Sequence, residues 1–380
     1  MRVLRRTYDY IIVGAGLFGS VMAERIAALT GYSVLVIEKR NHIGGNCYSE
    51  TDPETEIEFH KYGPHIFHTS SYIAWEYVHK FADFTSYCHR VMASYKNNLY
   101  PFPVTLSLIN RFFGLKLTPA EAGEFMAGKR VPIETVGTFE DLALSSIGRE
   151  LYEAFFENYT LKQWGRSPGV LPAENFARIP VRLNYNESYY NDTWCGMPMD
   201  GYSAFLGRLL GSQKIKVSLN TDFFEVRNSL RFRRGLIYTG PLDRFFHHCE
   251  GRLSYRTVDI FREVHPIPDL QGVSVVNYPE PAFPYTRIVE PRHFHPERHY
   301  RTDSTLIFKE VPRDDDGVNP FYPVNGEEDK GTLMRYQKRA RAERNVIFGG
   351  RLGTYRYLDM DKVILSALRA FQERIVSLGI

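Results

Sequence analysis

The sequence has few cysteines, little net charge and no long apolar run. Its four cysteines lie far apart and form no CxxC pair, so we expect free thiols in a reducing compartment. The net charge of +3, from 47 Lys and Arg against 44 Asp and Glu, gives no support for nucleic-acid binding. No apolar run approaches the roughly 18–20 residues of a membrane span. We therefore expect a cytoplasmic protein with no membrane span and no nucleic-acid partner.

The remaining composition is that of a globular protein with an excess of aromatic residues. Apolar residues make up 43% and charged residues 24% of the 380 residues, which excludes a disordered chain, a collagen and a coiled coil. This length is typical of two or three domains or of one elaborated domain. The 25 Tyr and 26 Phe, together with many arginines, favour a site that stacks rings and holds anions.

The N-terminal segment has the pattern of a dinucleotide-binding unit. Residues 8–13 and 33–38 are short apolar strands, and residues 16–29 between them have helical spacing. The turn after the first strand contains Gly14, Gly16 and Gly19, which allow a tight turn, close approach of a pyrophosphate and close helix packing. Glu38 ends the second strand, where a carboxylate can bind ribose hydroxyls.

A second glycine pair favours FAD over a nicotinamide cofactor. Gly44 and Gly45 follow closely after Glu38, so a second loop can lie against the dinucleotide, which resembles the FAD-binding flavoproteins. Near the C-terminus, a short strand at 346–348 is followed by Gly349, Gly350 and Arg351, which are placed to close over the same cofactor. We therefore predict that the cofactor is FAD.

The middle of the chain predicts an inserted helical domain and then a sheet. The pattern from about residue 71 to 163 is helical, with capping signals at Thr118 and Thr138 and a third helix over 150–163. Residues 165–180 are rich in Gly and Pro and form a loop. Short apolar strands between about 180 and 300 predict a mostly antiparallel sheet. The last helix carries an apolar face: Ile364, Leu368, Phe371, Ile375 and Leu378.

The predicted fold class is α/β: an FAD-binding Rossmann-like domain with an inserted helical domain and an antiparallel β-sheet domain. The predicted boundaries are 1–80 for the first FAD-binding segment, 81–177 for the helical insertion with a mobile loop, 178–200 and 240–335 for the substrate sheet domain, and 201–239 and 336–380 for the remaining FAD-binding segments.

Several further segments, spread along almost the whole chain, resemble those of the bacterial UDP-galactopyranose mutases. They are YGPHIFHT at 62–69, YTLKQWG at 159–165, RIPVR at 178–182, PYTR at 284–287, FYPVN at 321–325, GRLGTYRY at 350–357 and YLDMD at 357–361. Together these segments are far more specific than the glycine motif alone.

The resemblance implies a particular reaction. Members of this family interconvert UDP-galactopyranose and UDP-galactofuranose with no net redox change, and N5 of reduced FAD acts as the nucleophile on the anomeric carbon. It also implies a reductant, such as NAD(P)H or a reductase, and a homodimer that forms through the helical insertion. The sequence leaves open whether galactose, N-acetylgalactosamine or a pentose is the preferred sugar.

The resemblance also implies the site residues. The expected catalytic residues are Arg178 and Arg287, which hold the diphosphate, and His65 beside the flavin. The expected substrate-binding residues are Phe155, Phe156, Tyr159, Thr160, Trp164, Arg178, Tyr189, Asn277, Arg287, Tyr322 and Tyr357. The expected cofactor-binding residues are Gly14, Gly16, Phe18, Gly19, Glu38, Lys39, Gly45, Asn46, His65, Ile66, Arg351, Tyr357, Leu358 and Asp359. Because aromatic residues at helical spacing usually form core, we expect at least one of Phe155 and Phe156 to be buried in the helical domain.

Two other classes of function remain open from the residues alone. An FAD-dependent oxidoreductase of the amine-oxidase or desaturase type would share the cofactor motifs, since fold does not imply function. A non-enzymatic protein that binds a flavin or a nucleotide sugar would share them too. We predict no metal site, and we interpret His293, His295 and His299 as residues of a polar loop.

Overall fold

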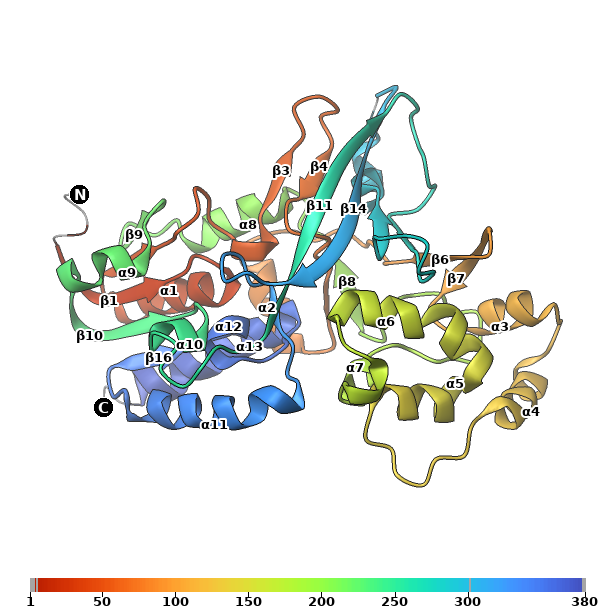
Figure 1. Cartoon of the computed structure of the whole chain (residues 1–380). Coiled ribbons are helices and arrows are strands. Elements are labelled where there is room, and N and C mark those ends of the chain that lie inside the picture. The colour runs from red at the N-terminus through yellow and green to blue at the C-terminus, as the bar shows by residue number, and fades with distance from the viewer. Residues whose placement is uncertain (1–3, 5, 301, 378–380) are drawn as a thin grey trace.

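Three bodies of secondary structure make up the protein (Figure 1). The structure is a computed structural model, and it describes residues 4, 6–300 and 302–377. A parallel sheet and its helices hold both the first and the last elements of the chain, a long antiparallel sheet stands beside it, and helices from the middle of the chain form the third body. Within the described residues, no helix combines the length and the apolar character needed to cross a membrane.

The parallel sheet confirms the predicted Rossmann-like unit. Its five strands lie in the order β16 (Val346–Phe348), β10 (Arg231–Tyr238), β1 (Thr7–Val13), β2 (Val34–Ile37) and β9 (Ile215–Ser218). All four strand pairs are parallel. The carboxyl ends of the strands therefore meet at one edge, which is where open α/β sheets bind their ligands.

Helices cover both faces of this sheet, and for that reason β1 and β2 are nearly continuous apolar runs. On one face, α1 (Leu17–Thr30) packs against α8 (Gly201–Leu209) and α13 (Met360–Phe371). On the other face, α9 (Phe223–Val226) and α10 (Leu242–Phe245) join an apolar cluster with alternate residues of β1. A π-helical turn at Gln372–Val376 continues α13, and the predicted face residue Leu378 lies outside the described residues.

The second sheet is predominantly antiparallel. Its order is β15 (Tyr322–Pro323), β11 (Tyr255–His265), β14 (Thr305–Asp314), β13 (Arg287–Val289), β12 (Val275–Asn277), β6 (Val91–Tyr95) and β7 (Asn98–Phe102). Only the β12–β6 pair in this sheet is parallel. Two short pairs, β3 (Ser49–Thr51) with β4 (Glu58–His60) and β5 (Phe67–Thr69) with β8 (Trp194–Gly196), complete the strands that the described residues form.

The β6–β7 hairpin shows that the helical prediction for residues 71–163 is wrong over this stretch. The two strands pair directly across a turn at Lys96 and Asn97, and both residues have positive φ. That backbone matches the twist of a tight hairpin, and an asparagine is one of the few side chains that tolerate it. The hairpin then extends the antiparallel sheet instead of the helical body.

The helical body confirms the capping signals. It contains α3 (Leu106–Phe113), α4 (Pro119–Lys129), α5 (Phe139–Phe155), α6 (Glu157–Trp164) and α7 (Glu174–Ala177). Thr118 forms a capping box at the start of α4, and Thr138 forms one at the start of α5. The helix predicted over 150–163 is divided at Phe156, which separates α5 from α6. Besides the helices on the parallel sheet, three further helices lie outside this body: α2 (Tyr72–His79), α11 (Glu327–Ala342) and α12 (Gly350–Thr354).

Candidate active site

A pocket runs along the carboxyl edge of the parallel sheet. Residues that follow β1, β2, β9, β10 and β16 within three positions line it: Gly14, Glu38, Thr221, Thr239 and Gly350. The loop that contains Gly44, Gly45 and Asn46 forms another wall, as does Phe321 from the antiparallel sheet. The pocket is therefore assembled from segments that are far apart along the chain.

The glycines of this pocket allow the chain segments around it to approach one another closely. Gly14 has a φ of +101°, and a Cβ atom there would lie 2.1 Å from the hydroxyl oxygen of Thr239. Gly16 and Gly44 form a parallel bridge, and the amide of Gly44 donates a hydrogen bond to the carbonyl of Ala15 at 2.8 Å. The two glycine loops thus lie side by side at the start of α1, where a helix N-terminus favours a phosphate. This bare cradle fits the pyrophosphate of a dinucleotide.

Glu38 is buried at the end of β2 and fixes the glycine turn. Its Oε2 accepts a hydrogen bond from the amide of Ala15 at 2.9 Å, and its Oε1 accepts one from the amide of Arg40 at 2.9 Å. A carboxylate has about four lone-pair positions, so further positions remain for the ribose hydroxyls of a nucleotide.

Most of the predicted cofactor-binding residues line this pocket. They are Gly14, Gly16, Phe18, Gly19, Glu38, Lys39, Gly45, Asn46, His65 and Arg351. Four others do not line it: Ile66 is buried in the main core, and Tyr357, Leu358 and Asp359 lie at the turn before α13. The carbonyl of Leu358 accepts a hydrogen bond from Nε of Arg351 at 2.6 Å, which ties this turn to the pocket.

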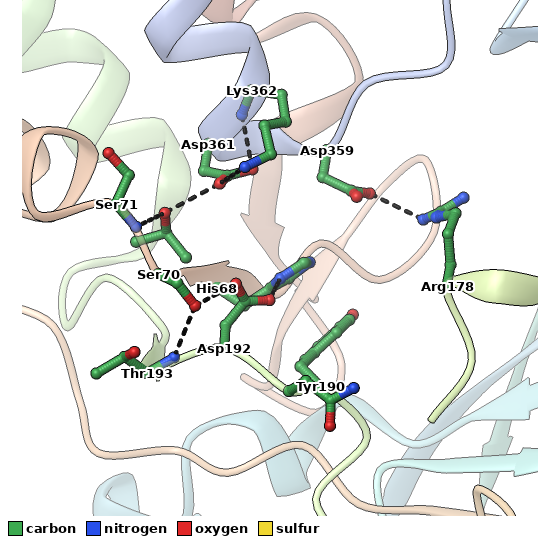
Figure 2. A network of polar contacts seen from close by, with 12 residues as sticks. His68, Ser70, Ser71, Arg178, Tyr190, Asp192, Thr193, Asp359, Asp361 and Lys362 are labelled. Carbon is green, nitrogen blue, oxygen red and sulfur yellow. Dashed lines mark hydrogen bonds and ion pairs between the residues drawn. The ribbon is translucent and has the colours of Figure 1, made fainter. Parts of the chain in front are cut away.

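Arg178 joins this turn from the glycine- and proline-rich loop. Its Nη2 lies 2.9 Å from Oδ1 of Asp359, and its guanidinium carbon lies 4.2 Å from the centre of the Tyr357 ring. Figure 2 shows Arg178 pointing to Asp359 at the start of α13. Burial raises the pKa of Tyr357, but the nearby Arg178 and Arg351 outweigh it, so that this pKa lies below its usual value.

Arg287 is the second arginine of the site and has a buried carboxylate partner. Its Nε donates to Oε2 of Glu310 at 2.7 Å. The other carboxylate oxygen of Glu310 is buried, has no partner within the described residues, and faces Gly63 of the loop that carries His65. Burial lowers the pKa of Arg287, but Glu310 outweighs it and keeps the guanidinium charged.

Aromatic side chains surround the two arginines. Burial raises the pKa of Tyr159, Tyr189 and Tyr322 above the usual value, so their hydroxyls stay protonated and can donate. The rings of Tyr322 and Tyr357 lie 5.9 Å apart, and Trp164 lies 5.5 Å from Tyr322. These aromatic residues come from α6, β15 and two loops. Together with Arg178 and Arg287 they form a cluster of cations and hydroxyl donors.

The remaining predicted substrate residues are more buried. Phe155 and Phe156 are 3% and 2% exposed and both belong to the core of the helical body, where Phe156 packs against Phe176 at 5.3 Å. The prediction that at least one of them is core is therefore confirmed for both. Thr160 and Asn277 are also buried, at α6 and at the end of β12.

His65 and His68 have different surroundings. Nδ1 of His65 lies 2.8 Å from the carbonyl of Gly63, and burial together with Arg351 lowers its pKa to about 4, so the ring is neutral near pH 7. His68 stacks on Tyr190 at 3.6 Å and lies 2.7 Å from Asp192, in the contact group shown in Figure 2. Only His65 of the two lines the pocket.

Comparisons with known proteins agree with this geometry. Residues 154–357 match the family model described as UDP-galactopyranose mutase, and residues 12–81 match an NAD(P)-binding Rossmann-like domain. The chain is 41% identical to the probable UDP-galactopyranose mutase of Klebsiella pneumoniae, with 98% of this chain and 96% of that protein covered. The chain belongs to the UDP-galactopyranose mutase family.

Other relatives show the range of the family. The chain is 36% identical to the dTDP-fucopyranose mutase of Escherichia coli, over 95% of this chain and 97% of that protein. It is 30% identical to the UDP-galactopyranose mutase of Mycoplasma genitalium, over 97% of this chain and 95% of that protein. Like the mutases of this family, the chain is an isomerase.

Solved structures show that the fold is shared more widely. A crystal structure of reduced UDP-galactopyranose mutase has a TM-score of 0.74 at 15% identity and covers 98% of this chain and 94% of its own. A putative protoporphyrinogen oxidase from Exiguobacterium has a TM-score of 0.64 at 13% identity, over 98% of this chain and 99% of its own. Because oxidases and mutases share this fold, the fold alone does not separate them.

The mutase family and its Rossmann-like domain imply a flavin-type cofactor, and the glycine cradle fits one.

The sequence analysis missed one wall of this pocket, made by Thr239, Gly240 and Pro241 after β10 and by Thr221 and Asp222 after β9. The prediction of a mostly antiparallel sheet between about 180 and 300 is wrong for β9 and β10, which belong to the parallel sheet. Ligand-binding loops follow the carboxyl ends of such strands, so recognising the two strands as parallel would have found these residues.

Proposed function

We propose that this protein is a flavin-dependent UDP-galactopyranose mutase, which interconverts UDP-galactopyranose and UDP-galactofuranose. The observation that carries the proposal is the pair of arginines, Arg178 and Arg287, set among tyrosine hydroxyls beside a dinucleotide pocket. Burial raises the pKa of Tyr189, and the charges of Arg287 and Arg178 both lower it, as expected for a phenol near two cations. Two guanidinium groups at the substrate site disfavour an amine oxidoreductase, because they repel a protonated amine.

FAD fits the pocket along the parallel sheet. The glycines of the 14–19 turn and Gly45 would receive its pyrophosphate, Glu38 would bind a ribose, and His65 and Arg351 would lie toward the flavin end. When bound in the reduced state, FAD supplies a nucleophilic nitrogen, N5, for the anomeric carbon of the sugar.

The chain's own residues stabilise the leaving group. Arg178 and Arg287 hold the diphosphate, since a guanidinium donates two parallel hydrogen bonds to phosphate oxygens and stays charged at any working pH. Tyr189, Tyr322 and Tyr357 donate hydrogen bonds to the same group or to the sugar. Charge builds on the diphosphate as UDP departs, so these donors act most strongly in the transition state.

Arg178 closes the site by exchanging partners. In this structure its guanidinium bonds Asp359, and both side chains are partly exposed. A diphosphate carries more charge than one carboxylate, so the substrate competes for Arg178 and draws the 165–178 loop over the cleft. Such a lid excludes water from the reacting carbon.

The test is an anaerobic assay. The purified FAD-loaded protein is incubated with UDP-galactopyranose with and without dithionite, and the products are separated by ion-exchange chromatography. A second UDP-hexose that forms only with the reductant would establish a redox-neutral mutase. dTDP-fucopyranose is run in parallel, because the Escherichia coli relative is a mutase named for that substrate.

The other outcomes decide among the alternatives. Turnover of dTDP-fucopyranose alone would keep the reaction and change the nucleotide sugar. Failure to bind either UDP or dTDP would refute the nucleotide-sugar proposal, and consumption of an organic substrate with net flavin reduction would favour an oxidoreductase.

A further inference from the structure

The ammonium group of Lys162 lies inside a ring of four backbone carbonyls. Its Nζ is 2.6 Å from the carbonyl oxygen of Tyr278 and 3.0 Å from each of those of Glu280, Phe283 and Tyr285. Lys162 belongs to α6 of the helical body, whereas all four carbonyls belong to the loop of residues 278–286 in the antiparallel sheet. One side chain therefore holds a loop of another body.

The rings of Tyr278, Phe283 and Tyr285 pack on one another in this loop, but few backbone hydrogen bonds hold its main chain. Prolines at 279, 281 and 284 have no amide hydrogen to donate. Inside the loop, the backbone bonds are those from the Tyr278 amide to the Thr286 carbonyl at 2.8 Å and from the Phe283 amide to the Glu280 carbonyl at 3.3 Å. A lysine ammonium has three donors and no acceptor, which suits a ring of carbonyls. Burial lowers the pKa of Lys162 to about 8, so the group is still mostly protonated at pH 7.

The two ends of the loop are residues of the candidate site. Asn277 ends β12 and Arg287 begins β13, and the two residues are paired across the strands. On the other side of the contact, Lys162 lies between Tyr159 and Trp164 in α6. The clamp thus connects the segment that carries the site arginine to the helix that carries the site aromatic residues.

Neighbouring contacts fasten the same turn of α6 to the sheet. The side chain of Gln163 donates to the hydroxyl of Tyr322 and lies 3.5 Å from the hydroxyl of Thr286. Arg256, which is 3% exposed, donates to the carbonyls of Lys162 at 3.0 Å and Gln163 at 3.1 Å. Several contacts therefore fix the end of α6, whereas the main chain of the 278–286 loop makes few backbone hydrogen bonds of its own.

We propose that Lys162 is a positioning residue of the nucleotide site. It fixes the 278–286 loop so that Asn277 and Arg287 face Tyr159 and Trp164. This inference rests on the proposed function, because it concerns the same binding site. Lys162 donates to backbone atoms and touches no reacting atom, but the loop it holds ends at Arg287. Its loss should therefore weaken substrate binding and, because the contacts of Arg287 strengthen in the transition state, lower kcat as well.

The test uses the FAD-loaded variant Lys162→Met. Titration calorimetry should give a dissociation constant for UDP at least tenfold above that of the unmodified protein. KM for the sugar nucleotide should rise by the same factor and kcat should fall by about three- to thirtyfold, with the flavin absorbance spectrum unchanged. Hydrogen exchange of the holoenzyme should be at least tenfold faster for backbone amides of 278–286 and unchanged in α1.

A matched control separates the clamp from the loss of any lysine. Lys129 lies in the same helical body and pairs with Glu150 at 2.6 Å, away from the site. Lys129→Met should leave the UDP affinity and the exchange of the 278–286 loop unchanged. Lys162→Gln, which keeps two donors, should lie between Lys162→Met and the unmodified protein in both measurements.

Several results would overturn the proposal. Unchanged UDP affinity and unchanged exchange of the loop in Lys162→Met would show that the clamp positions nothing. A fall in kcat with KM unchanged would place Lys162 in the chemistry instead. Loss of FAD from both Lys162 variants would make its role one of folding. If the unmodified protein binds no UDP, the proposed function fails, and the exchange of the loop still tests the clamp.

Discussion

Replacing Arg178 by alanine should separate catalysis from stability. In the structure, the side chain of Arg178 is 41% exposed and that of its partner Asp359 is 29% exposed. An ion pair between partly exposed side chains contributes only about 0–1 kcal/mol to the free energy of unfolding. The Arg178→Ala variant should therefore fold and bind FAD as the unmodified protein does.

The effect on turnover should be far larger. Two charge-assisted contacts to the departing diphosphate are lost, and removing such donors raises the activation barrier by about 2–4 kcal/mol. This corresponds to a roughly 30- to 1,000-fold fall in kcat, since each 1.4 kcal/mol is about tenfold. The anaerobic assay with reduced protein measures this fall, and urea denaturation measures the stability.

Arg166 provides the matched control. It lies on the same loop but pairs with Glu328 at 3.4 Å, and its side chain is 33% exposed. Arg166→Ala should keep kcat within threefold. The reasoning is refuted if Arg178→Ala also keeps kcat within threefold, or if it loses FAD along with activity.

Three further predictions concern the cofactor turn and two ion pairs. Gly14→Ala should abolish FAD binding, measured by flavin absorbance, because the new Cβ would lie 2.1 Å from the threonine hydroxyl after β10. Glu310→Ala should lower the free energy of unfolding by about 2 kcal/mol in urea, since the mostly buried guanidinium of Arg287 loses its carboxylate. Burial raises the pKa of Asp52, but Arg262 outweighs it and holds this pKa at about 2. The pair therefore stabilises the fold above the unfolded-state pKa of about 3.9, and the stability difference between the unmodified protein and Asp52→Asn should close as the pH falls from 5 to 2.

Local signals in the sequence were sufficient for the first strand–helix–strand unit of the cofactor sheet. The predicted strands 8–13 and 33–38 and the helix 16–29 match β1, β2 and α1 to within one residue at each end. Their signals are contained in short windows: apolar runs, glycines at fixed spacing and an acidic residue at a strand end. The capping boxes at Thr118 and Thr138 were predictable for the same reason.

The arrangement of the site needed information that no short window contains. The β6–β7 hairpin was missed because its turn, Lys96-Asn97, lacks glycine and stands in a stretch rich in helix signals. The contact between Arg178 and Asp359 joins residues 181 positions apart, and only the resemblance pointed to both. The Lys162 clamp is invisible in sequence, because its partners are backbone carbonyls, which every residue has.

The strand order of the parallel sheet has a consequence for how the protein is made. Its central strands β1 and β2 leave the ribosome early, but β9, β10 and β16 follow only after residues 215, 231 and 346. Helices α3 to α7, by contrast, form one contiguous stretch, and their contacts with one another are short in sequence. Because non-local pairing folds slowly and local helical contacts fold fast, the helical body can form during synthesis while the cofactor pocket waits for almost the entire chain. A flavin can therefore bind only after almost the whole chain has left the ribosome, since the pocket needs residues that follow β16.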